Sequence, residues 1–512
     1  MGSRRKHGAS GVIPKTSHPP ARREAVPSNG TFSVAAASEW VALALILAFS
    51  LLTLCYPAVR AFYRFESNYN EGWNVYNALA AMQHQPLYYP KYGWTTVDYP
   101  VLSFYFVGYI SHFTGDYLLT GRLISLIALL LSCVLVGLIV KKLTGGWKPA
   151  LFAGAFCLGL FCSRATDYVA TDDPQMFAHV FFLSGLWLYL GGRPSTGRIA
   201  GITSLFALGG NIKHSPLPAC LAVFSDLFMT SKSKALQFAL FGLFLLAVSI
   251  AFNIRVGGPF FISQLMLSTT YSFAKLRDAF FTLHSPLGLP LTFSAFWSLW
   301  QLRNPQARTI SLYFFWSVLT CLAFGGGSGV GDNAHFDIFF AMSIITGAWL
   351  DLLWKAPIPS FGKGGRWRFL VPVLLYLCVA FAFVSQGVKL RNDFTLLSMR
   401  ERAYIREVSF LVEHPGPAIC ESLIMCYDAG KPFIFDPFNA TRLVRLGKLD
   451  SNEIVQRIAA RGYAAFQLDN SVDLKVTDRF PEDVLYALDK YYYEALKGPD
   501  CHIYLPHRRP GS

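Results

Sequence analysis

The sequence predicts a mainly α-helical, polytopic membrane protein with a small α/β domain at its C-terminal end. Long apolar segments recur between residues 40 and 388 and are separated by short loops. Only 15% of the 512 residues are charged, 53% are hydrophobic, and the mean hydropathy is +0.37. Soluble globular chains carry about 25% charged residues. The composition therefore indicates a chain whose solvent is largely lipid.

The chain is expected to begin with a disordered cytoplasmic tail over residues 1–34. This stretch is polar and basic, and it lacks the apolar core of a cleavable signal peptide. The first apolar run, Trp40–Val59, contains no charged residue and has about the 20 residues that a helix needs to cross a bilayer. We expect this run to be an uncleaved membrane anchor.

Further apolar segments extend the predicted transmembrane domain over residues 35–388. With the first run they predict about eleven transmembrane helices, although several are short for a full crossing. The further segments are Leu123–Val140, Pro149–Ser163, Pro174–Gly192, Ile199–Ile212, Ser215–Thr230, Ala235–Ile254, Ser285–Leu302, Thr309–Phe324, Phe336–Leu350 and Phe369–Val388.

Loop charges predict the orientation of the chain. Basic residues gather in alternate loops, as they do on the cytoplasmic side of membrane proteins, whereas the glycine-rich turn 325–331 of the opposite set has none. This asymmetry and the odd number of spans place the C-terminus outside. The net charge of +14 belongs to these short loops, which argues against nucleic-acid binding. The basic loops contain Lys141 and Lys142, Lys232 and Lys234, Arg303 and Arg308, and Arg366 and Arg368.

Two segments depart from simple spans. Val101–Phe113 would invert all later loops if it crossed the membrane, so we expect it to lie against the outer face, where its aromatic residues suit the interface. The short segments Ile199–Ile212 and Ser215–Thr230 meet at Lys213. We interpret them as a broken hairpin, which membranes tolerate where it lines a cavity or is buried in protein.

The composition becomes soluble-like after residue 388, and residues 389–512 predict a small extracytoplasmic α/β domain. Pro432–Phe435 and Ala464–Leu468 are the predicted strands, and Asn452–Arg461 and Glu482–Leu496 the predicted helices. Three cysteines fall in this domain, so one disulfide is possible but its pairing stays open. They are Cys420, Cys426 and Cys501.

The first outer loop, about residues 62–118, offers two acids, Glu71 and Asp98, among many aromatic residues. Aromatic faces suit sugar rings, and a carboxylate beside a hydroxyl can take its proton as the hydroxyl attacks. The alternative is that Glu71 caps the start of a helix and Asp98 is a solvated surface acid. A second acidic pair, Asp172 and Asp173, precedes Pro174. It could orient an acceptor, but it equally suits a helix N-cap. Paired aspartates also suit a divalent metal.

Cations on the predicted outer side are few, and each is a candidate for binding an anion. Lys213 lies at the break of the hairpin, at membrane depth, where an ionisable group is a functional hypothesis by default. Arg122 and Arg255 lie at span ends, where snorkelling is the alternative. Lys91 lies in the first loop. His335 follows the glycine-rich turn, whose backbone N–H groups suit an anion.

These residues resemble the polytopic GT-C glycosyltransferases, which use polyprenyl- or dolichyl-phosphate sugars. The likeness is greatest to lipid A aminoarabinose transferases and protein O-mannosyltransferases. In those families the first loop opens with Asp-Glu and later carries an acid before a Pro-Pro-Leu-like segment. Here Asn70-Glu71 occupies the place of the Asp-Glu pair, and Asp98-Tyr-Pro-Val-Leu102 occupies the place of the later acidic segment. The layout matches over roughly residues 35–350.

Two residues depart from the family pattern. Asn70 replaces the leading Asp, and Val101 replaces the second Pro. The resemblance therefore implies that Glu71 or Asp98 takes the role of the base.

The resemblance implies an inverting enzyme that moves a sugar from a polyprenyl-phosphate donor to a glycolipid, polysaccharide or protein acceptor. No external cofactor is expected, and metal dependence stays open. Its place would be a bacterial inner membrane, with the active site on the outer face. Donor and acceptor would contact Lys213 first of all, and with it Arg122, Lys91, His335, Arg255 and Tyr99, beside the acids Glu71, Asp98, Asp172 and Asp173.

Two other classes of function compete with the transferase. A transporter or lipid flippase also uses broken helices, but the chain shows no paired repeats, and its long acidic and aromatic first loop has no transport role. A non-catalytic partner subunit is the second alternative, because Asn70 replaces an acid.

Overall fold

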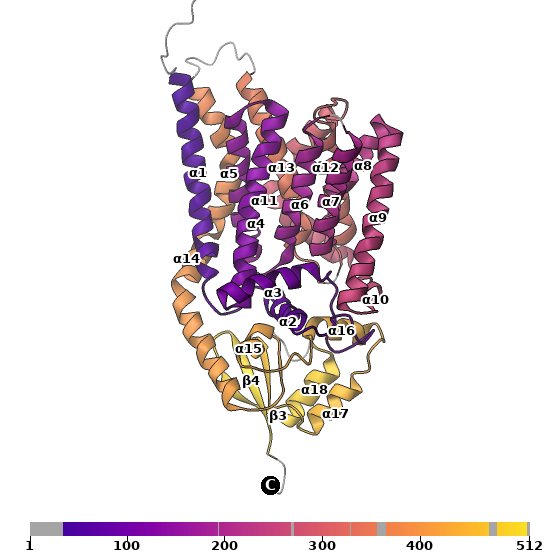
Figure 1. Cartoon of the computed structure of the whole chain (residues 1–512). Helices are drawn as coiled ribbons and strands as arrows, with labels where there is room; N and C mark the ends of the chain where they lie inside the picture. The colour runs from indigo at the N-terminus through magenta and orange to yellow at the C-terminus, as the bar shows by residue number, and fades with distance from the viewer. Residues whose placement is uncertain are drawn as a thin grey trace, which may run out of the picture.

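The computed structural model describes residues 34–192, 194–267, 271–327, 329–355, 365–469 and 479–508. The predicted N-terminal tail lies outside this part except for its last residue. The described chain forms a bundle of long helices, with a smaller region that contains a sheet at one end of the bundle (Figure 1). We call this smaller region, residues 418–508, the cap region, and the adjoining end of the bundle its cap end.

Each of the apolar segments predicted from the sequence overlaps a helix of the bundle. Among the described residues, α1, α4, α9, α13 and α14 are long and apolar enough to cross a membrane, and α8 and α12 are shorter apolar helices. The number of crossings stays a prediction. The bundle contains α1 (Val34–Arg60), α4 (Tyr117–Thr144), α5 (Trp147–Arg164), α6 (Pro174–Tyr189), α7 (Thr196–Ile212), α8 (Pro218–Thr230), α9 (Lys232–Gly257), α11 (Phe273–Gln301), α12 (Arg308–Phe324), α13 (Phe336–Lys355) and α14 (Gly365–Glu413).

Lysines and tryptophans meet at the end of the bundle opposite the cap region. The Lys141 ammonium lies 3.4 Å from the Trp147 ring centroid, and that of Lys142 lies 3.7 Å from the Trp187 ring. Rings and cations of this kind favour the boundary between lipid and water. This end therefore has the character of a membrane interface.

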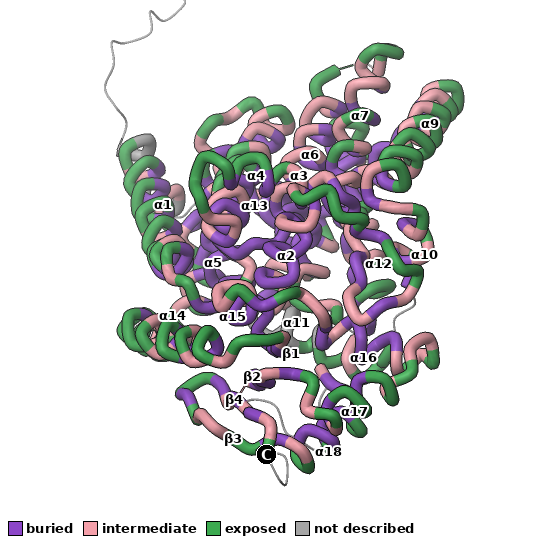
Figure 2. Tube along the Cα trace, turned by 60° about the horizontal axis from the view of Figure 1, so that its bottom comes forward, coloured by how far each residue is buried: buried purple, intermediate pink, exposed green. Residues whose placement is uncertain are grey.

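Short helices occupy the space between the bundle and the cap region. They are α2 (Asn70–Met82), α3 (Leu102–Thr114) and α10 (Phe261–Leu265), with the 3-10 turns Thr166–Tyr168 and Asp332–His335. Helix α3 covers most of the segment that we expected at the membrane surface, and it lies at the cap end beside α2 (Figure 1). Helix α2 is buried along most of its length (Figure 2).

The cap region contains a four-stranded sheet in the order β1-β2-β4-β3. Strand β1 pairs parallel to β2, and the other pairs are antiparallel. A core that includes Phe435, Phe466 and Phe480 packs against the sheet. The elements are β1 (Ala418–Cys420), α15 (Leu423–Asp428), α16 (Pro437–Arg445), α17 (Asn452–Ala459), β2 (Ala465–Asp469), α18 (Glu482–Tyr491), β3 (Tyr492–Lys497) and β4 (Cys501–Pro506).

Two elements of this region differ from the prediction. Pro432–Phe435 is irregular and joins no strand. The helix predicted over Glu482–Leu496 ends at Tyr491, and the following residues form β3 because they pair with β4. A local sequence pattern favours helix here, but the partner strand satisfies the backbone groups of 492–497 as a ladder.

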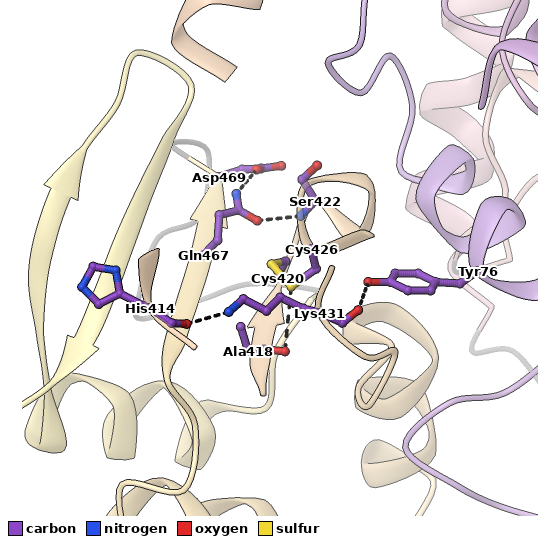
Figure 3. Close-up of a disulfide and its surroundings, with 9 residues drawn as sticks. All are labelled: Tyr76, His414, Ala418, Cys420, Ser422, Cys426, Lys431, Gln467 and Asp469. Carbon is purple, nitrogen blue, oxygen red and sulfur yellow. Dashed lines mark hydrogen bonds between the residues drawn. A yellow bond between two sulfur atoms is a disulfide. The ribbon is translucent and has the colours of Figure 1, made fainter. Parts of the chain in front are cut away.

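A disulfide joins Cys420, the last residue of β1, to Cys426 in α15, whereas Cys501 is free (Figure 3). The bridge closes the turn that packs against α2. The Tyr76 hydroxyl of α2 donates a hydrogen bond of 2.8 Å to the Lys431 carbonyl, just beyond α15. Lys431 in turn donates from its ammonium to the carbonyl of His414.

Helix α14 connects the bundle to the cap region without a break. It runs over 49 residues and continues beyond residue 388, where we placed the domain boundary. The composition changes at that point because the helix leaves the apolar bundle, not because the element ends.

Gly72 lets α2 approach α15 closely. A Cβ at this position would lie 2.3 Å from the Ile424 nitrogen and 2.6 Å from the Leu423 carbonyl carbon. Backbone atoms cannot move away as a flexible side chain can. Glycine is therefore the residue that this helix contact requires.

We predict that Gly72→Ala loosens the contact between α2 and α15 and costs about 1–3 kcal/mol of stability, the range for overpacking. Thermal unfolding of the purified chain in detergent measures this, and hydrogen exchange locates it in α15. Gly387→Ala in α14 is the matched control, since no heavy atom beyond its chain neighbours and its own stretch of helix backbone lies within 4 Å of the added Cβ. Equal melting temperatures for both variants would contradict the prediction.

Candidate active site at the cap end of the bundle

A buried ion pair between Glu71 and Arg122 lies at the centre of the cap end. Arg122 Nε donates to Glu71 Oε1 at 2.6 Å, and Nη2 donates to Oε2 at 2.7 Å. Both residues have no exposed surface. The pair therefore joins the N-terminus of α2 to the beginning of α4.

The remaining hydrogen-bonding groups of the pair are also occupied. The backbone N–H groups of Ser67 and Asp172 donate to the two carboxylate oxygens of Glu71. Arg122 donates to the carbonyls of Tyr63 and Phe65. Burial alone would raise the pKa of Glu71, but Arg122 and the two N–H groups outweigh it and hold the pKa below its ordinary value. Glu71 and Arg122 thus have their partners within the protein.

Asp172 is buried nearby but lacks a full set of partners. Its Oδ2 has no hydrogen bond, and its carboxyl lies over Gly121, where a Cβ would be 2.1 Å from Cγ. Burial and the neighbouring charges of Glu71 and Asp173 raise the pKa of Asp172 well above its ordinary value, against Arg122. The carboxyl therefore favours its protonated form.

A small cavity adjoins Asp172 at the junction of α2, α3, α4 and α6. Asn74, Ser103 and Asp173 line it together with Asp172, and the rest of the lining is apolar. Asn74 Oδ1 and Ser103 Oγ are also buried without a partner. Three polar atoms that have no hydrogen bond thus belong to residues around one cavity, which suits a water molecule or a hydroxyl group.

Asp173 and Lys213 form a second buried ion pair. The Lys213 ammonium lies 3.1 Å from both carboxylate oxygens and donates to the Tyr99 hydroxyl at 3.0 Å. Asn70 donates from Nδ2 to Asp173 Oδ2 at 3.2 Å. The structure thus brings together residues from the first loop, the start of α6 and the end of α7.

Local sequence explains how this pair is positioned. Asp173 is the N-cap of α6, and its Oδ1 accepts from the Gln175 N–H at 2.7 Å, with Pro174 in the first turn. Lys213 follows the last residue of α7, and α8 begins only at Pro218. Capping and ion pairing therefore occur together at Asp173, and the helix break directs Lys213 toward it.

Asp98 lies at the boundary with the cap region and is the most accessible of the four predicted acids. Its side chain is 26% exposed, and its carboxylate lies 3.4 Å from Arg442 of α16. Burial, Asp173 and Asp98 raise the pKa of Tyr99 well above its ordinary value, against Arg442, so Tyr99 stays a neutral phenol. The charges of Asp98 and Arg442 therefore act on the cluster that Lys213 forms with Asp173 and Tyr99.

Arg442 is not among the predicted site residues, because nothing in the sequence links it to Asp98. It lies 344 residues further along the chain, in a helix with one other arginine, Arg445. Only the packing of the cap region against the first loop brings the two side chains together.

Side chains of α9 and α10 hold the loop that contains Asp98. Asn253 Oδ1 accepts from the Val101 N–H at 2.9 Å, and Gln264 Oε1 accepts from the Val97 N–H at 3.1 Å. Both side chains are buried. They satisfy backbone groups of an irregular segment, which fixes its course.

The other predicted cations lie around this cluster rather than in it. His335 is buried and stacks against Phe339 of α13. Lys91 is exposed and lies over the Tyr92 ring, and Arg255 is exposed near the end of α9. Their roles in binding stay predictions. Within the described residues, no group of three or more His, Cys, Asp or Glu is placed to hold a metal ion.

Residues 325–327 and 329–331 of the glycine-rich turn lie between the 3-10 turn Thr166–Tyr168 and the cap region. A Cβ on Gly329 would lie 2.3 Å from the Phe438 ring, and one on Gly331 would lie 2.4 Å from the Tyr168 hydroxyl. Beyond the turn, Asn333 Nδ2 donates to Gln175 Oε1 at 3.0 Å. The glycines allow the turn to lie close to both partners.

Comparison with solved structures identifies the fold. No family model matches the sequence, and no curated protein matches it. The crystal structure of ArnT from Cupriavidus metallidurans bound to undecaprenyl phosphate matches with a TM-score of 0.57 and 12% identity, over 91% of this chain and 98% of that one. The oligosaccharyltransferase of Archaeoglobus fulgidus, tethered with an acceptor peptide, matches with a TM-score of 0.52 and 10% identity, over 91% and 74%.

The chain thus has the fold of polytopic GT-C glycosyltransferases, and the family resemblance drawn from the first loop is confirmed at the level of the fold. ArnT is a lipid A aminoarabinose transferase, one of the two families to which the first loop pointed. The match spans almost the whole length of ArnT in its apo form as well, with 98% covered.

We predict that Glu71→Ala destabilises the chain by about 3–5 kcal/mol, because it leaves the Arg122 charge buried without its partner. Denaturant unfolding in detergent measures the change. Asp500→Ala, which removes an exposed pair with Arg400, is the control and should cost at most about 1 kcal/mol. Similar losses in the two variants would show that the Glu71–Arg122 pair is not a principal contact.

Asp172→Asn should alter how stability depends on pH. A carboxyl whose pKa is raised on folding contributes stability that is fully present below its unfolded pKa, near 3.8, and is lost as pH rises toward the folded value. Asparagine keeps the shape but does not titrate. The variant should therefore gain stability relative to the native chain as pH rises above about 4.

Melting temperatures at a series of pH values measure this difference. The exposed Glu482→Gln in α18 serves as the control and should follow the native chain. Parallel pH profiles for Asp172→Asn and the native chain would contradict a raised pKa at Asp172.

Proposed function

We propose that the chain is an inverting glycosyltransferase that moves a sugar from a polyprenyl-phosphate donor to a glycolipid, polysaccharide or protein acceptor. The observation that carries this proposal is the cluster of Tyr99, Asp173 and Lys213, with Asp98 beside it, between the bundle and the cap region of a GT-C fold. Such a cluster offers carboxylates to a hydroxyl and a cation to a phosphate.

Asp98 is the best candidate for the base. Glu71 would have to leave Arg122 and two backbone N–H groups before it could accept a proton. Its lowered pKa makes it a weak base as well. Asp98 is partly exposed, so an acceptor hydroxyl can reach its carboxylate without disrupting the core. Glu71 in this proposal positions α2 instead of touching substrate.

Lys213 supplies positive charge where the phosphate leaves. Its pairing with Asp173 keeps the ammonium in a fixed place, and the Tyr99 hydroxyl accepts one of its hydrogen bonds. Fixed charges of this kind stabilise a developing anion because they need no reorganisation during the reaction. The sugar–phosphate bond of the donor provides the driving force, so the proposal requires no external cofactor.

The cap region is proposed to face the outside of the cell, in a bacterial inner membrane. A disulfide in this region suits an oxidising compartment. The opposite end of the bundle carries lysines, which favour the cytoplasmic side, beside tryptophans, which favour either interface.

Reconstituted full-length protein with labelled polyprenyl-phosphate sugars tests the proposal. Asp98→Asn and Lys213→Met should each lower transfer by about 100-fold or more, while the exposed Glu482→Gln should retain the native rate. Melting temperatures of all variants confirm folding. Full activity in both variants would refute the site, and solute flux without sugar transfer would favour a transporter.

A further inference from the structure

Arg442 is held in place on the face of the cap region that meets the first loop. Its helix, α16, begins at Pro437 with Asp436 as N-cap, whose Oδ1 accepts from the Asn439 N–H at 3.0 Å. The same oxygen accepts from the Tyr69 hydroxyl at 2.6 Å. Tyr69 directly precedes α2, so the start of α16 is bound to the first loop. The Arg442 side chain is only 8% exposed.

The Arg442 guanidinium is buried with few partners. It donates from Nη2 to Asp98 at 3.4 Å, a long contact, and its Nε is buried without a hydrogen bond. Arg122 shows the contrast, because Glu71 and backbone carbonyls engage all of its nitrogens. The Arg442 guanidinium therefore retains a donor that a ligand can use.

The surroundings of Arg442 suit an anion with an organic body. Its guanidinium carbon lies 5.8 Å from the centroid of the Phe438 ring. Arg479 lies 5.5 Å from the same ring and 4.1 Å from that of Tyr69. Two guanidinium groups thus lie near one aromatic side chain, at the boundary between the first loop and the cap region.

Arg442 also lies beside the reacting groups of the proposed transferase. Its partner Asp98 is the proposed base and precedes Tyr99, whose hydroxyl accepts from Lys213. Arg442 also contributes to the electrostatics of Tyr99. An anion held by Arg442 would therefore be bound next to the acceptor hydroxyl.

We propose that Arg442 is a donor-phosphate ligand that the cap region contributes to the site, an inference that rests on the proposed function. A guanidinium presents a planar fork of N–H donors that matches phosphate oxygens, and such charge-assisted bonds are the strong ones. The phosphate would accept a hydrogen bond from the unpartnered Nε of Arg442 and would compete with Asp98 for the Nη2 donor. Donor binding thereby loosens Asp98 from Arg442 and leaves its carboxylate available to the acceptor hydroxyl.

Binding of a long-chain polyprenyl phosphate to the full-length protein in nanodiscs tests this without any need for turnover. The neutral polyprenol of the same length is the comparison, since it shares the tail but lacks the phosphate. Arg442→Ala should reduce the preference for phosphate over alcohol by about tenfold or more, as expected for loss of a charge-assisted hydrogen bond. Arg442→Lys should retain part of it.

Asp98→Asn is expected to change the affinity for polyprenyl phosphate in the opposite direction. It therefore separates an effect on binding from an effect on folding. Removing the competing carboxylate should strengthen polyprenyl phosphate binding, whereas a structural salt bridge would lose stability in both variants and change the preference in neither. Arg445→Ala, an exposed arginine one turn along α16, is the matched control and should bind as the native chain does. Native preference in a folded Arg442→Ala would overturn the proposal, even if sugar transfer by the native chain is established. A tenfold loss without any sugar transfer would support the phosphate site and count against the proposed function.

Discussion

The buried pair of Glu71 and Arg122 is the contact on which the cap end depends. Neither charge reaches water, so each must find its full set of partners within the protein. Arg122 donates to the carbonyls of Tyr63 and Phe65 as well as to Glu71. Glu71 also accepts from the backbone N–H groups of Ser67 and Asp172. The pair therefore fixes the loop between α1 and α2, the start of α2 and the start of α6 with one set of hydrogen bonds.

Helix α2 transmits this constraint in two directions. Toward the cap region, Gly72 admits the backbone of α15 and Tyr76 bonds to the Lys431 carbonyl. Toward the bundle, Asn70 bonds to Asp173 and Asn74 to the carbonyl of Asp172. A single short helix thus sets the distance between the acids of the bundle and the guanidinium groups of the cap region. This explains why a helix of the first loop is buried almost as deeply as the core.

The sequence predicted much of the fold because hydrophobic periodicity and helix breaks are local signals. Each of these features depends on residues only a few positions away in the chain. Examples are the apolar segments, the break at Lys213 and the cap at Asp173. Strand β3 could not be predicted in this way, because its partner strand decides its conformation. The partners of individual side chains could not be predicted for the same reason. Glu71 and Arg122 are 51 residues apart in the chain, and Asp98 and Arg442 are 344 apart.

The replacement of the leading acid by Asn70 has a physical consequence within the cluster. Asn70 donates from its amide to Asp173 Oδ2, whereas a carboxylate there would repel Asp173, with Lys213 as the cation bonded to it. Like charges this close require a proton or a further cation. With asparagine, Asp173 and Lys213 balance each other, and in the proposed function the carboxylate that acts as base is that of Asp98. Its counter-charge is Arg442, so this ion pair joins the first loop to the cap region.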